Sequence, residues 1–165
     1  MTREEKQLLL KDLCARLSYI TYYDLSYYGH ETRAVLQEFI PAKEPLKSLV
    51  KVNTIVEPIP YENIKPYLRP MSSMTEEEKK ELLNTILGED GSQYFSVDVD
   101  GNIENTDSEY QDLNNFNLHY VNFNCETVST YIDWLNAHHF DFRGLIEKGL
   151  ALEAPEGMYE KGNSK

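Results

Sequence analysis

The sequence predicts an α+β protein built from two modules, and three observations carry this prediction. A capped amphipathic helix opens the chain, segments of period two rich in Tyr, Val and Ile follow it, and a second capped helix begins after four closely spaced prolines. We expect residues 1–57 to form a helix with a small SH3-like or twisted antiparallel β module, and residues 75–159 to form a second α+β module. Residues 58–74 are expected to be a proline-rich connector, and residues 160–165 a frayed tail.

The first helix is expected over residues 3–17. Thr2 followed by Glu5 is a capping box, in which each side chain accepts from the backbone N–H of the other residue. Cys14 is expected to be a small buried apolar residue, because no neighbouring His or basic cluster would activate its thiol. One apolar stripe follows helical spacing and comprises Leu9, Leu10, Leu13 and Leu17.

Three strands are expected next, within residues 18–28, 32–40 and 46–57, where β-branched and aromatic residues dominate. The first contains five tyrosines. A tyrosine-rich strand and loop suit a contact surface, although alternate tyrosines packed in a half-buried strand explain the pattern more simply. The prolines that follow predict no regular element through residues 57–72.

The second module begins with the clearest local signal in the chain. Thr75 and Glu78 form a capping box, acidic residues occupy the first turn, and Gly88 stops the helix, which predicts a helix over residues 76–87. Alternating residues from Phe95 onward then predict a hairpin. Its turn is expected to be type I′ at Asp100–Gly101.

A further strand is expected at residues 117–123, and a third helix at residues 126–138. Trp134 lies at the margin of the apolar stripe of this helix. We expect it to be mostly buried, with its indole N–H bonded to a backbone carbonyl or a water. The stripe comprises Val128, Tyr131, Ile132 and Leu135.

The charge is strongly acidic and unevenly distributed. Sixteen Lys/Arg face 28 Asp/Glu, giving a net charge of −12, and no Lys or Arg occurs between Lys80 and Arg143. Such a chain repels phosphate backbones, so we expect no direct nucleic-acid binding. No apolar stretch is long enough for a bilayer span, and the N-terminus lacks a signal-peptide core, so no membrane association is expected. Cys14 and Cys125 cannot build a disulfide framework, and a cytoplasmic location fits best.

Two motifs suggest metal chemistry. Residues 96–107 partly match a calcium-binding EF-hand loop, but Ser96 and Asp107 stand where Asp and Glu are usual, and an acidic hairpin is the favoured interpretation. The second is a histidine group. A small metal-assisted hydrolase is the alternative function, and it would use His119, His138, His139 and Asp141. Capping of a helix C-terminus explains the adjacent histidines more simply.

No nucleotide-binding or nucleophile motif is present, and we expect no cofactor and no catalytic residue. The sequence instead favours a non-enzymatic protein-interaction or regulatory protein of unknown partner and oligomeric state. One specific version is that residues 81–142 imitate the charge of nucleic acid and occupy a basic site on another protein. The candidate partner-binding residues are Tyr22, Tyr23, Tyr27, Tyr28, Asp98, Asp100, Glu104, Asp107, Glu109 and Asp112.

Three segments resemble a family of short uncharacterised proteins encoded by gut anaerobic bacteria and their phages or other mobile elements. They are KDLCARL at residues 11–17, ENIKPYLRPMSSMTEEEK at residues 62–79 and IDWLNAHHFDFRGLIEKGLALEAPEGMY at residues 132–159. The resemblance implies a bacterial or phage origin and a cytoplasmic setting. It implies no activity, ligand or catalytic residue.

Overall fold

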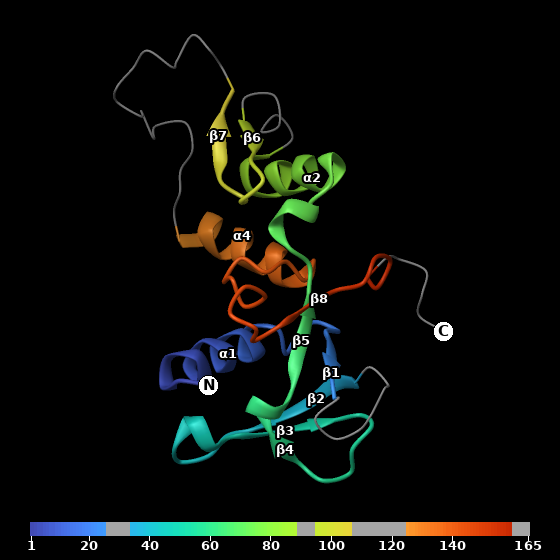
Figure 1. Cartoon of the computed structure of the whole chain (residues 1–165). Coiled ribbons are helices and arrows are strands. Elements are labelled where there is room, and N and C mark those ends of the chain that lie inside the picture. Colours follow the sequence, from blue (N-terminus) through green and yellow to red (C-terminus); the bar gives the residue numbers. More distant parts are fainter. Residues whose placement is uncertain (26–33, 89–94, 107–124, 160–165) are drawn as a thin grey trace. The chain divides into compact units, whose positions relative to one another are not determined.

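The chain divides into two compact units, and its fold class is α+β as predicted (Figure 1). Unit 1 comprises residues 1–69 together with residues 139–165, and unit 2 comprises residues 70–138. The sequence grouped residues 139–159 with the second module, whereas here they belong to unit 1. The computed structural model describes residues 1–25, 34–88, 95–106 and 125–159.

Unit 1 opens with helix α1, Arg3–Ala15, and its capping box is present as predicted. The Glu5 N–H donates to Thr2 Oγ1 at 3.1 Å, and the Thr2 N–H donates to Glu5 Oε2 at 2.6 Å. The predicted apolar stripe is only partly buried. Leu9 and Leu13 are fully buried, but Leu17 lies beyond the end of the helix and is 43% exposed.

The expectation of a buried Cys14 is wrong, because its side chain is exposed. Asp12 and Arg16 are both buried. The buried face of α1 is therefore rotated toward these two residues and away from the predicted stripe. Cys14 is about 100° around the helix from Leu13, away from Asp12, and therefore faces outward.

A six-stranded mixed sheet forms the rest of unit 1, in the order β4-β3-β2-β1-β5-β8. All neighbouring pairs are antiparallel except β5 and β8, which are parallel. The strands span Tyr22–Asp24 (β1), Ala34–Ile40 (β2), Leu49–Val52 (β3), Ile59–Pro60 (β4), Lys65–Leu68 (β5) and Leu152–Glu153 (β8).

The prediction that residues 57–72 lack regular structure is wrong, because β4 and β5 lie there. Pro60 is tolerated because β4 is an edge strand, where a missing N–H breaks no ladder on the open side. Pro66 lies inside β5, opposite Tyr23 of β1, and it is buried. Short 3₁₀ turns lie between β2 and β3 at Pro45–Lys47 (η2), between β4 and β5 at Tyr61–Asn63 (η3), and after β5 at Met71–Ser73 (η4).

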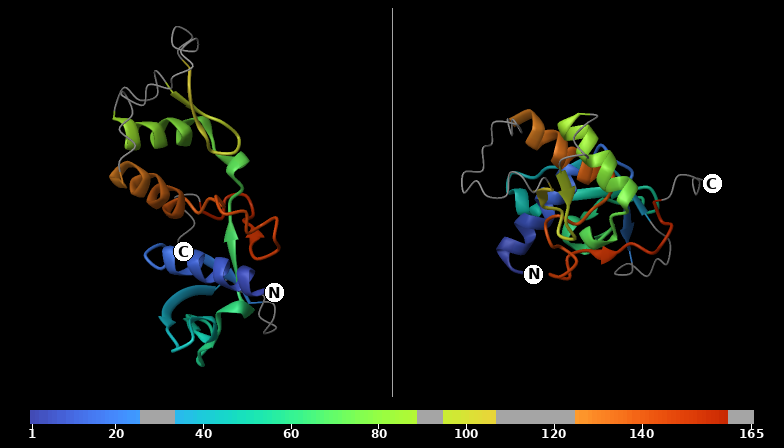
Figure 2. Two further views of the ribbon diagram at one scale, coloured as in Figure 1. Left: turned by 90° about the vertical axis from the view of Figure 1, so that its left-hand side faces the viewer. Right: turned by 90° about the horizontal axis from the view of Figure 1, so that it is seen from above.

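The core of unit 1 lies between α1 and the sheet (Figure 2). Leu9 and Leu13 of α1 belong to the same buried cluster as Tyr23, Val50 and Leu68 from three strands. The helix is also tied to η3 at the surface. The Tyr61 hydroxyl donates to the Lys6 carbonyl at 3.2 Å, and Lys6 pairs with Glu62 at 2.6 Å.

Unit 2 is inserted between two parts of unit 1. The end of the first part is hydrogen-bonded to the start of the second. The Arg69 N–H donates to the His139 carbonyl at 2.8 Å, and the Asp141 N–H donates to the Arg69 carbonyl at 2.8 Å. Arg69 and Phe140 thus form a parallel bridge that continues beside the β5–β8 pair. The residue that leaves unit 1 and the residues that return to it are held together by backbone hydrogen bonds.

Helix α2 of unit 2 spans Glu76–Leu87, as predicted to the residue. Thr75 and Glu78 form the capping box, and Gly88 ends the helix at φ 88°. Helix α4 spans Cys125–Ala137 and packs against α2. The predicted stripe of α4 is buried only at its C-terminal end, because Leu135 is fully buried whereas Val128 is 49% exposed.

A hairpin of β6, Phe95–Val97, and β7, Ile103–Asn105, is present as predicted, but its turn is not type I′. A type I′ turn needs positive φ at both central residues, and of this pair only Gly101 has it, at 90°. The Gly101 N–H donates to the Asp98 carbonyl and the Asp98 N–H donates to the Asn102 carbonyl. This is a three-residue loop with Gly in the bulge position.

The hairpin turn packs closely on the rest of unit 2. The Tyr131 hydroxyl of α4 donates to the Gly101 carbonyl at 2.9 Å. A Cβ at Gly101 would lie 2.2 Å from Cε of Met71 and 3.2 Å from the Tyr131 hydroxyl oxygen. Position 101 therefore requires glycine for its backbone conformation and for its lack of a side chain.

Two predicted features lie outside the described residues, namely the strand at residues 117–123 and the frayed tail at residues 160–165. Among the helices that the structure does describe, none combines the length and apolar composition needed to cross a bilayer.

Candidate functional site

A buried cluster of charged side chains lies in unit 1, where α1 meets the segment that follows unit 2. Asp12 and Arg16 are both fully buried, and Arg16 Nε donates to Asp12 Oδ2 at 2.9 Å. Arg143 Nη1 donates to the other oxygen, Asp12 Oδ1, at 2.8 Å. Arg16 Nη2 also donates to the Phe140 carbonyl at 2.8 Å. One carboxylate thus holds two guanidinium groups and joins α1 to the returning chain.

An aromatic ring covers these cations. The Arg143 guanidinium lies 4.2 Å from the centre of the Phe142 ring, and the Arg16 guanidinium lies 5.9 Å from the centre of the same ring. Burial lowers the pKa of Arg143, and Asp12 opposes this shift. The ion pairs are therefore screened from water and are strongly dependent on one another.

His139 is the one non-glycine residue with positive φ, at 63°, in the stretches that the structure describes. A His in this conformation stores backbone strain that neighbouring contacts must offset. Its ring stacks on Tyr159 at a centroid distance of 3.6 Å with an interplanar angle of 17°. His139 Nδ1 lies 3.3 Å from the Thr21 hydroxyl. These contacts hold the histidine at the start of the returning segment.

The Tyr159 hydroxyl bridges two neighbouring strands. It accepts from the Tyr22 N–H of β1 at 3.2 Å and donates to the Tyr67 carbonyl of β5 at 2.8 Å. Tyr23 pairs with Pro66, which places Tyr22 opposite Tyr67 in the same register. The Tyr159 hydroxyl therefore lies between the Tyr22 N–H and the Tyr67 carbonyl and replaces a direct hydrogen bond between the strands. Tyr159 therefore extends the β1–β5 pairing beyond the proline.

The residues proposed for a metal-assisted hydrolase are engaged in separate structural contacts. His138 belongs to unit 2 and His139 to unit 1. The Asp141 carboxylate accepts from the backbone N–H groups of Leu145 and Ile146, at 2.8 and 2.7 Å. His119 lies outside the described residues. In the part of the chain that is described, no group of three or more His, Cys, Asp or Glu side chains is arranged to hold a metal ion.

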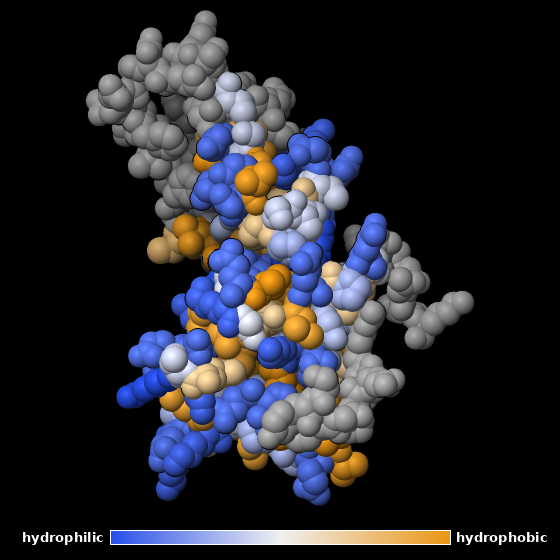
Figure 3. Space-filling model, viewed as in Figure 1, coloured by the Kyte–Doolittle hydropathy of each residue, from blue (hydrophilic) through white to orange (hydrophobic). Residues whose placement is uncertain are grey.

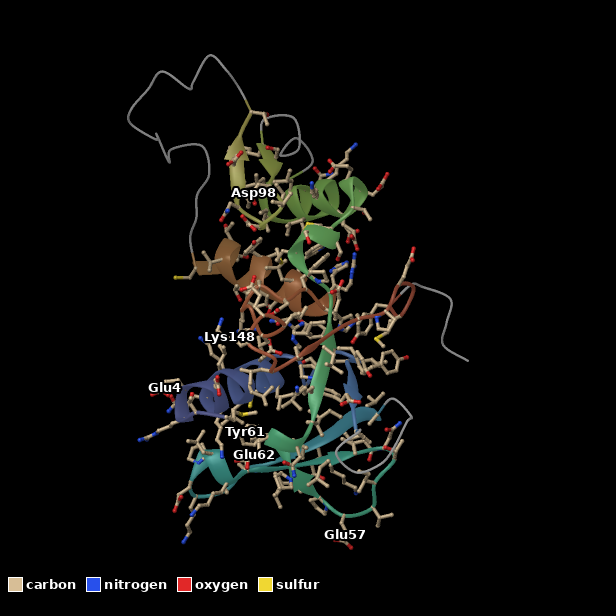
Figure 4. All side chains as sticks on the ribbon, in the orientation of Figure 1. Glu4, Glu57, Tyr61, Glu62, Asp98 and Lys148 are labelled. Atoms are coloured by element: carbon tan, nitrogen blue, oxygen red, sulfur yellow. The ribbon has the colours of Figure 1, made fainter. Side chains whose placement is uncertain are left out.

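The residues compared with a calcium loop form the turn of the β6–β7 hairpin, where Asp98 is labelled in Figure 4. The Asp98 carboxylate accepts from the Asp100 N–H, the Asn102 N–H and Asn102 Nδ2, each at 2.8 Å. The Asn102 side chain and these backbone donors lower the pKa of Asp98. Its oxygens are thus already used to stabilise the turn.

The candidate partner-binding residues fall into three groups. Tyr23 is fully buried, and burial, followed by the charge of Asp12, raises the pKa of its hydroxyl well above the ordinary value. This burial removes Tyr23 from any contact surface. Tyr22 is half-buried and stacks on Tyr159 at 5.7 Å. Asp98 is partly exposed, and Asp100 and Glu104 are exposed. Outside the described residues lie Tyr27, Tyr28, Asp107, Glu109 and Asp112.

The two units differ sharply in charge. Residues 70–138 contain two lysines against fourteen Asp/Glu, which gives unit 2 a net charge of −12. The rest of the chain contains fourteen Lys/Arg against fourteen Asp/Glu and is neutral. The entire net charge of the protein therefore resides in unit 2.

Most carboxylates described in unit 2 point into solvent, and hydrophilic residues cover much of the face of unit 2 seen in Figure 3. Of its two lysines, Lys79 is paired with Glu76 at 2.7 Å. Among the residues that the structure describes in unit 2, six carboxylates form no ion pair with another described residue. They are Glu77, Asp98, Asp100, Glu104, Glu126 and Asp133.

Sequence reasoning missed the buried cluster of unit 1. Asp12 and Arg16 stand at the i,i+4 spacing of a helical ion pair, a signal that is present in the sequence but usually marks an exposed pair. The partners that bury this pair come from Phe140 and Arg143, far along the chain. Neither spacing nor composition identifies them.

Comparisons with known proteins add no family to these observations: no protein-family model, no curated protein and no solved structure matches this chain.

Proposed function

We propose that the protein acts by binding a partner protein with a basic surface, through the exposed carboxylates of unit 2. The observation that carries this proposal is the separation of charge between the units, with −12 on unit 2 and zero on unit 1. A surface of one sign attracts partners of the opposite sign and accelerates their association. The same charge repels nucleic acids, so a protein partner is favoured over a phosphate backbone.

Two further observations support an interaction surface in unit 2. The exposed carboxylates Asp100, Glu104 and Asp133 come from the hairpin and from α4, and they form no ion pair among the described residues. Val99, in the hairpin turn beside Asp100, is 63% exposed. An apolar side chain among uncompensated charges is typical of protein contacts, where apolar area and charge complementarity act together.

The test uses two triple variants with the same change in net charge. Asp100→Lys, Glu104→Lys and Asp133→Lys alter unit 2, and the matched control carries Glu57→Lys, Glu147→Lys and Glu156→Lys in unit 1. All six side chains are exposed. The probe is a short Lys/Arg-rich peptide, and its binding is followed by fluorescence anisotropy between about 50 and 500 mM salt.

We expect the unit 2 variant to lose binding and the unit 1 variant to retain most of it, with affinity falling steeply as salt rises. Equal losses in the two variants would show that total charge, rather than the surface of unit 2, attracts the peptide. Binding that is insensitive to salt would contradict the proposal as well. The same pair of variants then serves for cross-linking in cells of the source organism, where a true partner is lost only with the unit 2 variant.

A further inference from the structure

We infer that His138 is a pH-responsive link between α2 and α4, and that Trp134 reports its state. This inference is independent of the proposed partner binding, because it concerns the internal packing of unit 2. His138 follows the last residue of α4, and its imidazole is partly exposed. It lies among an indole ring, a backbone carbonyl and a carboxylate, which all belong to unit 2.

Both ring nitrogens of His138 face oxygen atoms that accept hydrogen bonds. Nδ1 lies 2.9 Å from the Trp134 carbonyl oxygen, one helical turn earlier. Because a carbonyl can only accept, Nδ1 carries a proton in this arrangement. Nε2 lies 3.6 Å from Oε1 of Glu81 on α2. In the neutral ring, Nε2 would present a lone pair to this carboxylate, whereas in the imidazolium it presents an N–H.

An indole face and a helix terminus also lie against the ring. The imidazole stacks on the Trp134 indole at a centroid distance of 3.8 Å and an interplanar angle of 20°. A cation over the face of a Trp ring is attracted by the negative electrostatic potential of that face. His138 lies at the C-terminus of α4, where the partial negative charge of the helix dipole attracts cations.

Glu81 connects the two helices through a single oxygen. Its Oε1 accepts from the Trp134 indole N–H at 3.4 Å and faces Nε2 of His138 at 3.6 Å. Glu77 and Lys80 share one surface of α2 with Glu81. Strand β6, which also packs against α2, contains no charged side chain. Because its carboxylate faces the ring at 3.6 Å, Glu81 is the charged group that responds to protonation of His138.

Protonation of His138 adds an ion pair between α4 and α2 and a cation on the indole. Trp134 is the only tryptophan in the chain and is 7% exposed. An imidazolium in contact with an indole quenches its fluorescence. The tryptophan emission of the full-length protein therefore reports whether His138 is protonated.

The experiment is a titration of tryptophan emission in the full-length protein, with circular dichroism recorded on the same samples. We expect a loss of emission on acidification through about pH 5 to 8. The transition should disappear in His138→Gln and weaken in Glu81→Gln. Glu77→Gln, an exposed carboxylate one helical turn earlier on α2, is the matched control and should leave it unchanged.

Emission that is flat over this range would overturn the inference, as would a transition that persists in a folded His138→Gln variant. If that variant does not fold, the imidazole proton resonances of the wild-type protein decide. A His138 resonance that titrates at the midpoint of the fluorescence change supports the link, and one that titrates at a different pH contradicts it.

Discussion

The two units use charged residues in opposite ways. Unit 1 is neutral overall and buries an Asp12–Arg16 pair completely, with Arg143 as a second partner. Unit 2 carries the whole net charge and leaves most of its described carboxylates in solvent. Buried ion pairs depend on their surroundings, whereas exposed charges contribute little to stability. Charge therefore serves to connect segments in unit 1, and it is available for other molecules in unit 2.

The largest expected loss of stability is that of a variant at Arg16, compared with a variant at an exposed ion pair. Arg16→Ala removes a buried cation from Asp12 and should lower the free energy of unfolding by about 3–5 kcal/mol, because it leaves a buried carboxylate poorly compensated. Lys47→Ala breaks the exposed Lys47–Glu44 pair and should cost about 0–1 kcal/mol. Urea unfolding followed by circular dichroism measures both. Similar losses of stability in the two variants would show that the buried ion pair stabilises the protein no more than the exposed one.

The next effect compares two glycines of unit 2 with nearly equal φ, Gly88 at 88° and Gly101 at 90°. Gly88 has open space around it, so Gly88→Ala should cost about 1–3 kcal/mol from backbone strain alone. Gly101→Ala also forces Met71 and Tyr131 to move, which should add about 1–3 kcal/mol. Thermal unfolding of the two variants gives the comparison. Equal losses would mean that the hairpin turn is not packed on α4 and η4 as described.

A smaller effect tests whether the units unfold together. Thr2 and Thr75 begin α1 and α2 with the same capping box, one in each unit. Thr2→Ala and Thr75→Ala should each cost about 1 kcal/mol. In a single cooperative transition, both variants shift the same midpoint. The tyrosine signal follows unit 1 and the Trp134 emission follows unit 2. If the two signals show separate transitions, each variant should shift only the transition of its own unit.

The smallest effect concerns acid. Because its hydrogen bonds with Asn102 and the turn backbone lower the pKa of Asp98 in the folded state, Asp98 stabilises the hairpin above the pKa it has when unfolded. This contribution is lost as the pH falls through the lower folded value, below about pH 4. The amide resonances of Asp100 and Asn102 should shift together in this range. Their acid response should be absent in Asp98→Asn.

Local signals in the sequence predicted the helices well. Thr75, Glu78 and Gly88 act on neighbouring backbone groups, so the sequence alone determined the limits of α2. The hairpin was predicted from its alternation, but its turn type depended on the hydrogen bonds of Asp98, which favour a three-residue loop over a two-residue one. The same bonds explain why residues with an EF-hand-like pattern form a turn.

Contacts between distant segments could not be predicted from the sequence. Pro66 argued against a strand, but β5 pairs with β1 and with β8, and the Tyr159 hydroxyl bridges β1 and β5 beyond the proline. Asp12 and Arg16 would be an ordinary surface pair without the residues that follow unit 2. Trp134 was predicted to be buried and is. Its indole N–H bonds Glu81, a side chain on another helix, instead of a backbone carbonyl or a water.

The insertion of unit 2 within unit 1 sets an order of events during synthesis. A ribosome releases β5, then every residue of unit 2, and only afterwards β8 and Tyr159. Until these last segments emerge, one edge of β5 has no neighbour and Asp12 lacks Arg143, so unit 1 cannot be completed. Unit 2 is continuous in the chain and needs none of them. The second unit in the sequence is thus the first one able to finish folding on the nascent chain.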